Sequence, residues 1–186
     1  MQGQIRIKDR VVPYKLFKRD VKYGRLEFKT ISLEVVLPRR QRDEKKLINK
    51  HREWIYKKYC RIENALNESP PKDINYKRSR ESLKIEARKK ADEFSLLFGG
   101  RINKIFVRKM STKWASLSSR SNITLNSIVK FLPEELIEYI IYHEAAHLKE
   151  RKHGKSFKAL MKKKYSNWRD LEAELFKYWF ILQKEN

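Results

Sequence analysis

Three of the four histidines in this chain of 186 residues fall within eleven residues, as His143, His147 and His153. His143 and His147 are four residues apart, and residues at that spacing lie on one face of an α-helix. The apolar residues of the same stretch also recur at helical spacing: Ile137, Ile140, Ile141, Ala145 and Leu148. The fold must therefore accommodate a largely buried helix that carries two imidazoles.

The segment from His143 to His147 is an H-E-x-x-H motif, in which Glu144 follows the first histidine. Buried histidine and glutamate need polar partners, and a metal ion is such a partner. Two imidazoles that hold one ion, with Glu144 beside them as a candidate general base, are the local chemistry of a zinc-dependent hydrolase. The alternative is a pair of surface histidines on a charged helix, which the apolar surroundings disfavour.

Catalytic zinc has three protein ligands and one water, and the motif supplies two of the three. The spacing of the motif does not identify the third ligand. His153 lies six residues after His147 and directly before Gly154, where a chain that has left its helix can turn back. A glutamate of the last predicted helix, Glu172 or Glu174, is the other candidate. The rarity of histidine in the chain favours His153, and a single ligand cluster predicts one Zn²⁺ per chain.

The net charge of +22 comes from 45 Lys and Arg against 23 Asp and Glu. Such a charge favours binding to a polyanion such as nucleic acid, or steering of acidic substrates. A basic run beside the proposed site contains no acid: Arg151, Lys152, Lys155, Lys158, Lys162, Lys163 and Lys164. We expect weak, non-specific nucleic-acid binding there, with Lys162 to Lys164 as the patch. A solvated helix face is the alternative.

The composition indicates a folded, soluble protein. Hydrophobic residues make up 40% of the chain and aromatic residues 12%, which excludes a disordered polymer. No apolar run reaches transmembrane length and no secretory signal is recognised, so we expect a cytoplasmic protein without a membrane partner. The single cysteine, Cys60, excludes an intramolecular disulfide and a cysteine-based zinc site.

The first part of the chain predicts a small antiparallel strand meander followed by a helix. Residues 4–8, 11–17 and 30–35 alternate or are rich in strand formers, and Pro13 indicates an edge position for the second strand. A helical stripe runs over residues 41–66, and Ser69-Pro70-Pro71 then marks a joint. We therefore expect two domains, 1–68 and 69–186.

The second part predicts a short antiparallel sheet among helices, so the fold class is α+β. A helix over 79–98 ends at Gly99-Gly100, and Pro133 begins the helix that carries the motif. The predicted elements of this part are strands at 104–108, 113–118 and 122–126 and later helices at 155–164 and 167–182.

Nearly the whole chain resembles the YgjP-like metallopeptidases, a family related to the SprT-like and wider zincin peptidases. The similar segments occur in order: Leu33 to Pro38, Lys50 to Ile55, Lys113-Trp114-Ala115-Ser116, Ile123 to Asn126, Pro133, Tyr139 to His147, and His153-Gly154-Lys155-Ser156-Phe157. The resemblance implies a zincin-like core, zinc ligands His143, His147 and His153, and a catalytic Glu144.

Two segments depart from the family pattern. The strand Trp114-Ala115-Ser116-Leu117 has Ala and Leu where the family has Gly and Cys, and Lys158 stands where an aromatic residue is common. If Trp114, Ala115 and Ser116 line the cleft and pair with an extended peptide, the added methyl of Ala115 changes the substrate fit. Neither departure touches the predicted ligands or Glu144.

The sequence thus predicts a zinc metallopeptidase that acts on protein or peptide substrates, with Glu144 as the base that deprotonates a zinc-activated water. The alternative is a nucleic-acid-associated binding protein with a structural or vestigial zinc site. That alternative explains the charge better but explains Glu144 poorly, because structural zinc sites are closed by four ligands. A zinc hydrolase of a non-peptide substrate is a third possibility.

Overall fold

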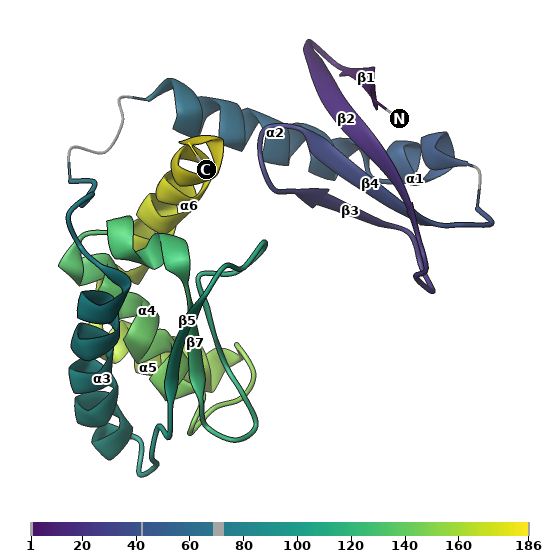
Figure 1. Cartoon of the computed structure of the whole chain (residues 1–186). Coiled ribbons are helices and arrows are strands. Elements are labelled where there is room, and N and C mark those ends of the chain that lie inside the picture. Colours follow the sequence, from purple (N-terminus) through teal and green to yellow (C-terminus); the bar gives the residue numbers. More distant parts are fainter. Residues whose placement is uncertain (1, 42, 69–72, 186) are drawn as a thin grey trace. The chain divides into compact units, whose positions relative to one another are not determined.

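The computed structural model describes residues 2–41, 43–68 and 73–185 (Figure 1). The chain forms two compact units, Met1–Pro70 together with Phe176–Asn186, and Pro71–Leu175. The predicted limits of the domains, 1–68 and 69–186, stay a prediction. The compact units differ from them by taking the residues from Phe176 onward into the first unit.

The first unit is a four-stranded sheet with helices. Its elements are β1 (Gln2–Ile7), β2 (Arg10–Arg19), β3 (Arg25–Phe28), β4 (Leu33–Pro38), α1 (Glu44–Lys50) and α2 (Arg52–Asn67). The core is made of buried sheet and helix residues: Ile7, Val12, Leu33, Val35, Leu37, Ile48, Ile55 and Tyr59. The helix predicted over 41–66 is in fact two helices, which are separated at His51.

The strand order in this sheet is β1-β2-β4-β3, and β2 pairs with β4 in parallel. The predicted antiparallel meander is therefore wrong in one pairing, because the chain passes β2, forms β3 at the edge and returns with β4 in the middle. The reason is burial. Leu33, Val35, Val36 and Leu37 are fully buried in β4, whereas β3 is short and charged, as suits an edge.

The predicted edge position of the Pro13 strand is also wrong, since β2 lies between β1 and β4. Pro13 is opposite Gln4 of β1, and pairing with β4 starts only at Tyr14. At Pro13 itself the strand therefore has a neighbour on one side, and the proline removes no bond to β4.

The second unit contains the H-E-x-x-H helix. Its elements are α3 (Arg80–Leu97), β5 (Ile105–Arg108), β6 (Ala115–Leu117), β7 (Ile123–Asn126), the 3₁₀-helix η1 (Ser127–Phe131), α4 (Glu134–Ala146), α5 (Lys155–Lys164) and the first part of α6 (Trp168–Glu185). The α+β class is confirmed. Gly99 ends α3 with a φ of +65°, as the sequence predicts.

The sheet of the second unit has the order β5-β7-β6. The pair β6 and β7 is antiparallel, but β5 and β7 are parallel, so the predicted antiparallel sheet is mixed. The cause is the same as in the first unit. Ile123 and Leu125 of β7 are fully buried and take the central place, which leaves β6 at an edge.

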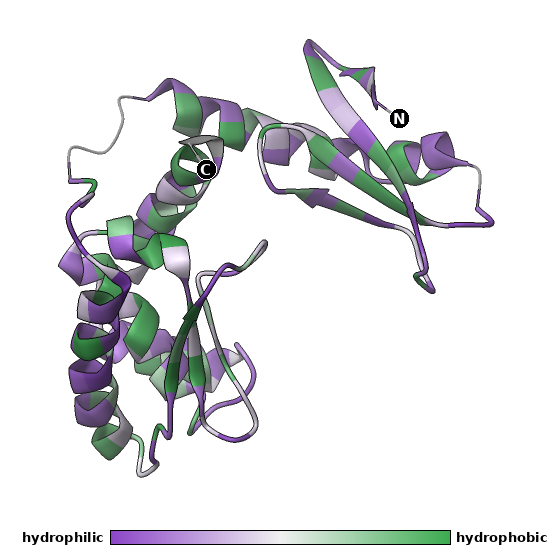
Figure 2. Cartoon of the chain, in the orientation of Figure 1, coloured by the Kyte–Doolittle hydropathy of each residue, from purple (hydrophilic) through white to green (hydrophobic). Residues whose placement is uncertain are grey.

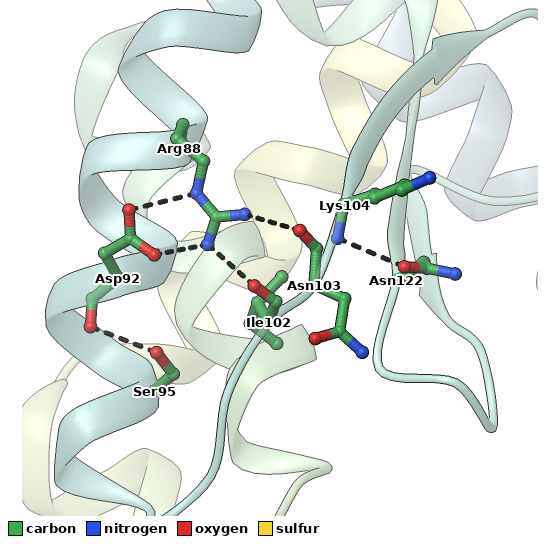
Figure 3. Close-up of polar contacts among 7 residues, drawn as sticks. All are labelled: Arg88, Asp92, Ser95, Ile102, Asn103, Lys104 and Asn122. Carbon is green, nitrogen blue, oxygen red and sulfur yellow. Dashed lines mark hydrogen bonds and ion pairs between the residues drawn. The ribbon is translucent and has the colours of Figure 1, made fainter.

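Polar contacts of Arg88 join α3 to the segment before β5 (Figure 3). The Arg88 guanidinium donates to the carbonyl oxygens of Ile102 at 3.0 Å and Asn103 at 3.3 Å. The backbone N–H of Lys104 then donates to Oδ1 of Asn122 at 3.1 Å, which connects β5 to the turn between β6 and β7. These bonds fix the sheet against α3.

Apolar residues gather along β5, β7 and α4, whereas α3 is largely hydrophilic on its outer side (Figure 2). In α4 the buried residues are Leu136, Ile137, Tyr139, Ile140, Ile141, Tyr142, Glu144, Ala145 and Ala146. A helix that is buried nearly all round is central to its unit. Across the described ranges, no helix is long and apolar enough to cross a membrane.

Candidate metal centre

The central helix α4 begins where the sequence predicts, at Pro133. Pro133 takes the N-cap position, and Glu134 and Glu135 lie in the first turn, where carboxylates favour the positive end of the helix dipole. The helix ends at Ala146, so His147 lies at the C-cap and still has helical backbone angles. His143 and His147 therefore keep the spacing of one helical face.

The chain turns back directly after α4 and returns a third histidine. Backbone N–H groups of Lys149 and Glu150 both donate to the carbonyl oxygen of Ala146, at 3.1 and 2.9 Å. This turn closes the segment between His147 and α5. It brings His153, rather than Glu172 or Glu174, into the group of possible ligands.

The three histidines present one nitrogen each within 4.8 Å of one another. Nε2 of His143 and Nε2 of His153 are 2.9 Å apart. For comparison, two nitrogens that bind one tetrahedral zinc at about 2.05 Å are about 3.3 Å apart. The donor set and its spacing therefore fit a zinc ion.

Two contacts orient these rings. Nδ1 of His147 lies 2.9 Å from the carbonyl oxygen of Glu150, which can only accept, so this nitrogen carries the proton and Nε2 keeps its lone pair. The buried ring of Phe157 packs against His143, His147 and His153, with ring centroids 4.7 to 4.8 Å apart. Phe157 belongs to the segment that follows His153, but periodicity alone gives it no role in the site.

The electrostatics favour neutral imidazoles. Burial, with smaller contributions from the other two histidines, lowers the pKa of His143 to about 3. Burial and His147 also lower the pKa of His153, although the charge of Glu172 opposes them. A histidine must be neutral to bind a metal ion, so the lowered pKa values of His143 and His153 favour the binding form of these two side chains at neutral pH.

Glu144 is 8% exposed, and burial raises the pKa of its carboxyl to about 7. A hydrogen bond from the backbone of Leu117 and the charge of Lys113 oppose that rise. A carboxyl with a pKa near neutrality can both accept and release a proton at that pH, as a general base and acid must.

The contact with Leu117 follows from the register of β6. The carbonyl of Trp114 accepts from the N–H of Asn126 in β7 at 2.7 Å, and the N–H of Ser118 donates to the carbonyl of Asn122, directly before β7, at 2.9 Å. Successive residues of a strand face opposite sides, so the backbone groups of Ala115 and Leu117 point to the other edge. Within the described residues β6 pairs with β7 alone, and Glu144 lies at its open edge.

The predicted substrate segment, Trp114 to Ser116, therefore lies beside the candidate base. Ala115 is buried, Trp114 and Ser116 are half-buried, and Ser116 is opposite Thr124 of β7. The departure from the family pattern at Ala115 thus falls at a residue whose backbone faces the open edge.

Asn126 is a functional candidate that sequence reasoning missed. Its side chain is fully buried and donates to the carbonyl oxygens of Met110 at 2.7 Å and Lys113 at 2.9 Å, while its Oδ1 accepts from the N–H of Met110 at 3.2 Å. These bonds fold the loop before β6. An asparagine between a buried strand and a short helix that it caps was the available signal.

One of the three lysines in the predicted basic patch interacts with other side chains of the protein. Nζ of Lys164 lies 3.2 Å from Glu138 and over the rings of Phe94, Tyr142 and Tyr165. Lys164 is thus engaged with α3 and α4 although it is exposed, and its place in the patch stays a prediction. Lys162 and Lys163 are exposed.

A family model described as "YgjP-like, metallopeptidase domain" matches residues 72–178, more than half of the chain. The crystal structure of the metallopeptidase zymogen of Pyrococcus abyssi abylysin is 25% identical, with 48% of this chain and 90% of that chain covered and a TM-score of 0.44. The corresponding zymogen of Methanocaldococcus jannaschii jannalysin is 28% identical, with 62% and 98% covered and a TM-score of 0.43. No curated protein matches the chain.

Proposed function

The chain belongs to the YgjP-like metallopeptidase family, and we propose that it hydrolyses peptide bonds at one zinc ion held by His143, His147 and His153. The observation that carries this proposal is the convergence of three imidazoles next to a buried carboxyl. The helix α4 supplies two imidazoles and Glu144, and the turn after it supplies the third.

Zinc, when bound, supplies a Lewis acid that polarises the scissile carbonyl and makes water acidic enough to lose a proton near neutral pH. Glu144 accepts that proton at its carboxylate and later gives it to the leaving amine. The burial that raises the pKa of Glu144 to about 7 suits both steps. Leu117 holds the carboxyl in place through its backbone.

The open edge of β6 supports a peptide substrate. The backbone N–H and C=O of Ala115 face the same edge as the N–H of Leu117, so an extended peptide can add to the sheet as a further strand. Main-chain bonds of this kind bind a peptide without regard to its side chains. They would place a scissile carbonyl beside Glu144.

The alternative, a nucleic-acid-associated protein with a structural or vestigial zinc site, explains the net charge of +22 but not the donor set of the site. Among the described residues the ligand group holds three side chains, one fewer than a closed structural site needs. The engagement of Lys164 with Glu138 further reduces the predicted patch.

The proposal is tested by removing and restoring the metal. Hydrolysis of an uncharged, internally quenched peptide library is measured before and after dialysis against a chelator, with metal content followed by mass spectrometry. We expect activity to disappear with zinc and to return at about one zinc per chain, but not with Mg²⁺. Full activity in protein free of zinc would contradict the proposal.

A further inference from the structure

Two stretches of the second unit carry many cations and no carboxylate. Residues 101–133 contain seven Lys and Arg and neither Asp nor Glu. Residues 151–169 contain eight Lys and Arg and again no acid. The rest of the chain holds the other 30 Lys and Arg together with all 23 Asp and Glu. The positive charge is therefore concentrated in two segments.

The first of these segments reaches the candidate base. It contains β5, β6 and β7, and its Lys113 lies two residues before the strand whose open edge faces Glu144. The Lys113 side chain is exposed, its backbone carbonyl is fixed by Asn126 at 2.9 Å, and its charge acts on Glu144. A peptide paired with β6 passes this lysine.

The second segment carries the third histidine. Arg151, Lys152 and Lys155 surround His153 in the chain, and all three are exposed. The turn that precedes this segment is bonded to Ala146 of α4 through Lys149 and Glu150, and His153 itself belongs to the histidine group. The negative charge of Glu172 also acts on His153. Its sign is opposite to that of the three cations.

We propose that the site prefers acidic polypeptides, with Asp or Glu on both sides of the scissile bond. This inference rests on the proposed function and adds a substrate class to it. One cationic segment lines the strand to which a peptide would pair, and the other lines the histidine turn. An acidic peptide gains attraction from both and a basic peptide is repelled, over a range set by a Debye length of about 8 Å in physiological salt.

The experiment uses three quenched peptides that share one scissile core and differ in their flanking residues: acidic, uncharged or basic. The zinc-loaded protein should cleave the acidic peptide about tenfold faster in kcat/KM than the uncharged one at low salt, because a few exposed charge pairs each add a small attraction. The basic peptide should be slowest, and the ratio should fall towards one in about 1 M salt, where the Debye length is about 3 Å.

The charge variant is Lys113→Gln combined with Arg151→Gln and Lys155→Gln, and Lys113→Gln alone is the second variant in case the triple one folds poorly. The matched control is Lys84→Gln with Lys89→Gln, which removes exposed lysines of α3. The acidic-to-uncharged ratio should fall to about two in the triple variant and remain unchanged in the control. A ratio within one enzyme does not depend on how much of it is active.

The outcomes separate the two proposals. Cleavage of the uncharged peptide without an advantage for the acidic one overturns the preference and leaves the peptidase function intact. Cleavage of no peptide by zinc-loaded protein refutes the proposed function, and the preference with it. Equal peptide rates combined with tight, salt-sensitive binding of a single-stranded oligonucleotide would assign the cations to nucleic acid instead and overturn the preference.

Discussion

Asn126→Ala should destabilise the protein strongly, because the side chain makes three good hydrogen bonds in a fully buried place. The two carbonyl oxygens of Met110 and Lys113 and the N–H of Met110 would lose their partner. A buried hydrogen bond contributes about 1 kcal/mol, so the loss amounts to about 3 kcal/mol. For a chain of this size that corresponds to a decrease of roughly 6–12 °C in Tm.

The assay is thermal unfolding followed by circular dichroism, with Asn103→Ala as the control. Asn103 is exposed and donates one side-chain bond, to the carbonyl oxygen of Arg120 at 2.8 Å, so its loss should lower Tm by no more than about 4 °C. The peptide hydrolysis of folded Asn126→Ala should also fall, because the loop before β6 loosens. A melting temperature within about 2 °C of wild type would refute the reasoning.

Three further predictions concern the site and its support. His153→Ala should lose most of the bound zinc, as should alanine at His143 or His147, and full retention by His153→Ala would move the third ligand to another residue. Phe157→Ala should lower both zinc affinity and Tm, since a buried Phe→Ala change costs about 3–5 kcal/mol; both are measured by zinc titration and thermal unfolding.

Glu138→Gln should destabilise the metal-free protein at pH 7, with a difference from wild type that shrinks as the pH falls. Burial alone would raise the pKa of Glu138, but bonds from Lys90, Lys164 and Tyr165 lower it below its ordinary value of 4.5. A lowered pKa contributes stability above the unfolded-state value, and that stability is lost as the pH falls through the folded-state value. Tm measured from pH 7 to pH 3 in chelator checks this, and a constant difference would contradict it.

The sequence predicts where the helices and strands of this protein lie better than it predicts which strands pair with one another. Alternation located the strands, and Gly99 and Pro133 marked helix ends through backbone conformations that act locally. The order of the strands depends on which of them is buried on both sides. That is decided by packing, so the parallel pairings of β4 and β7 could not be predicted from alternation.

The candidate site also has a part that the sequence predicts and a part that depends on packing and backbone bonds. His143, Glu144 and His147 are set by the helical repeat, so their arrangement follows from the sequence. His153 required the turn at Ala146, which depends on backbone bonds after the helix ends. The bond from the backbone of Leu117 to Glu144 could not be predicted at all, because a main-chain group leaves no residue signature.

The central claim is that Glu144 acts as the base beside a zinc ion, and Glu144→Gln tests it most directly. An amide of nearly the same shape cannot accept the proton, so the variant should keep about one zinc per chain and its fold. Its kcat on an uncharged peptide should fall by about 10²–10⁴-fold. Cleavage by the zinc-loaded variant at the wild-type rate would contradict the account.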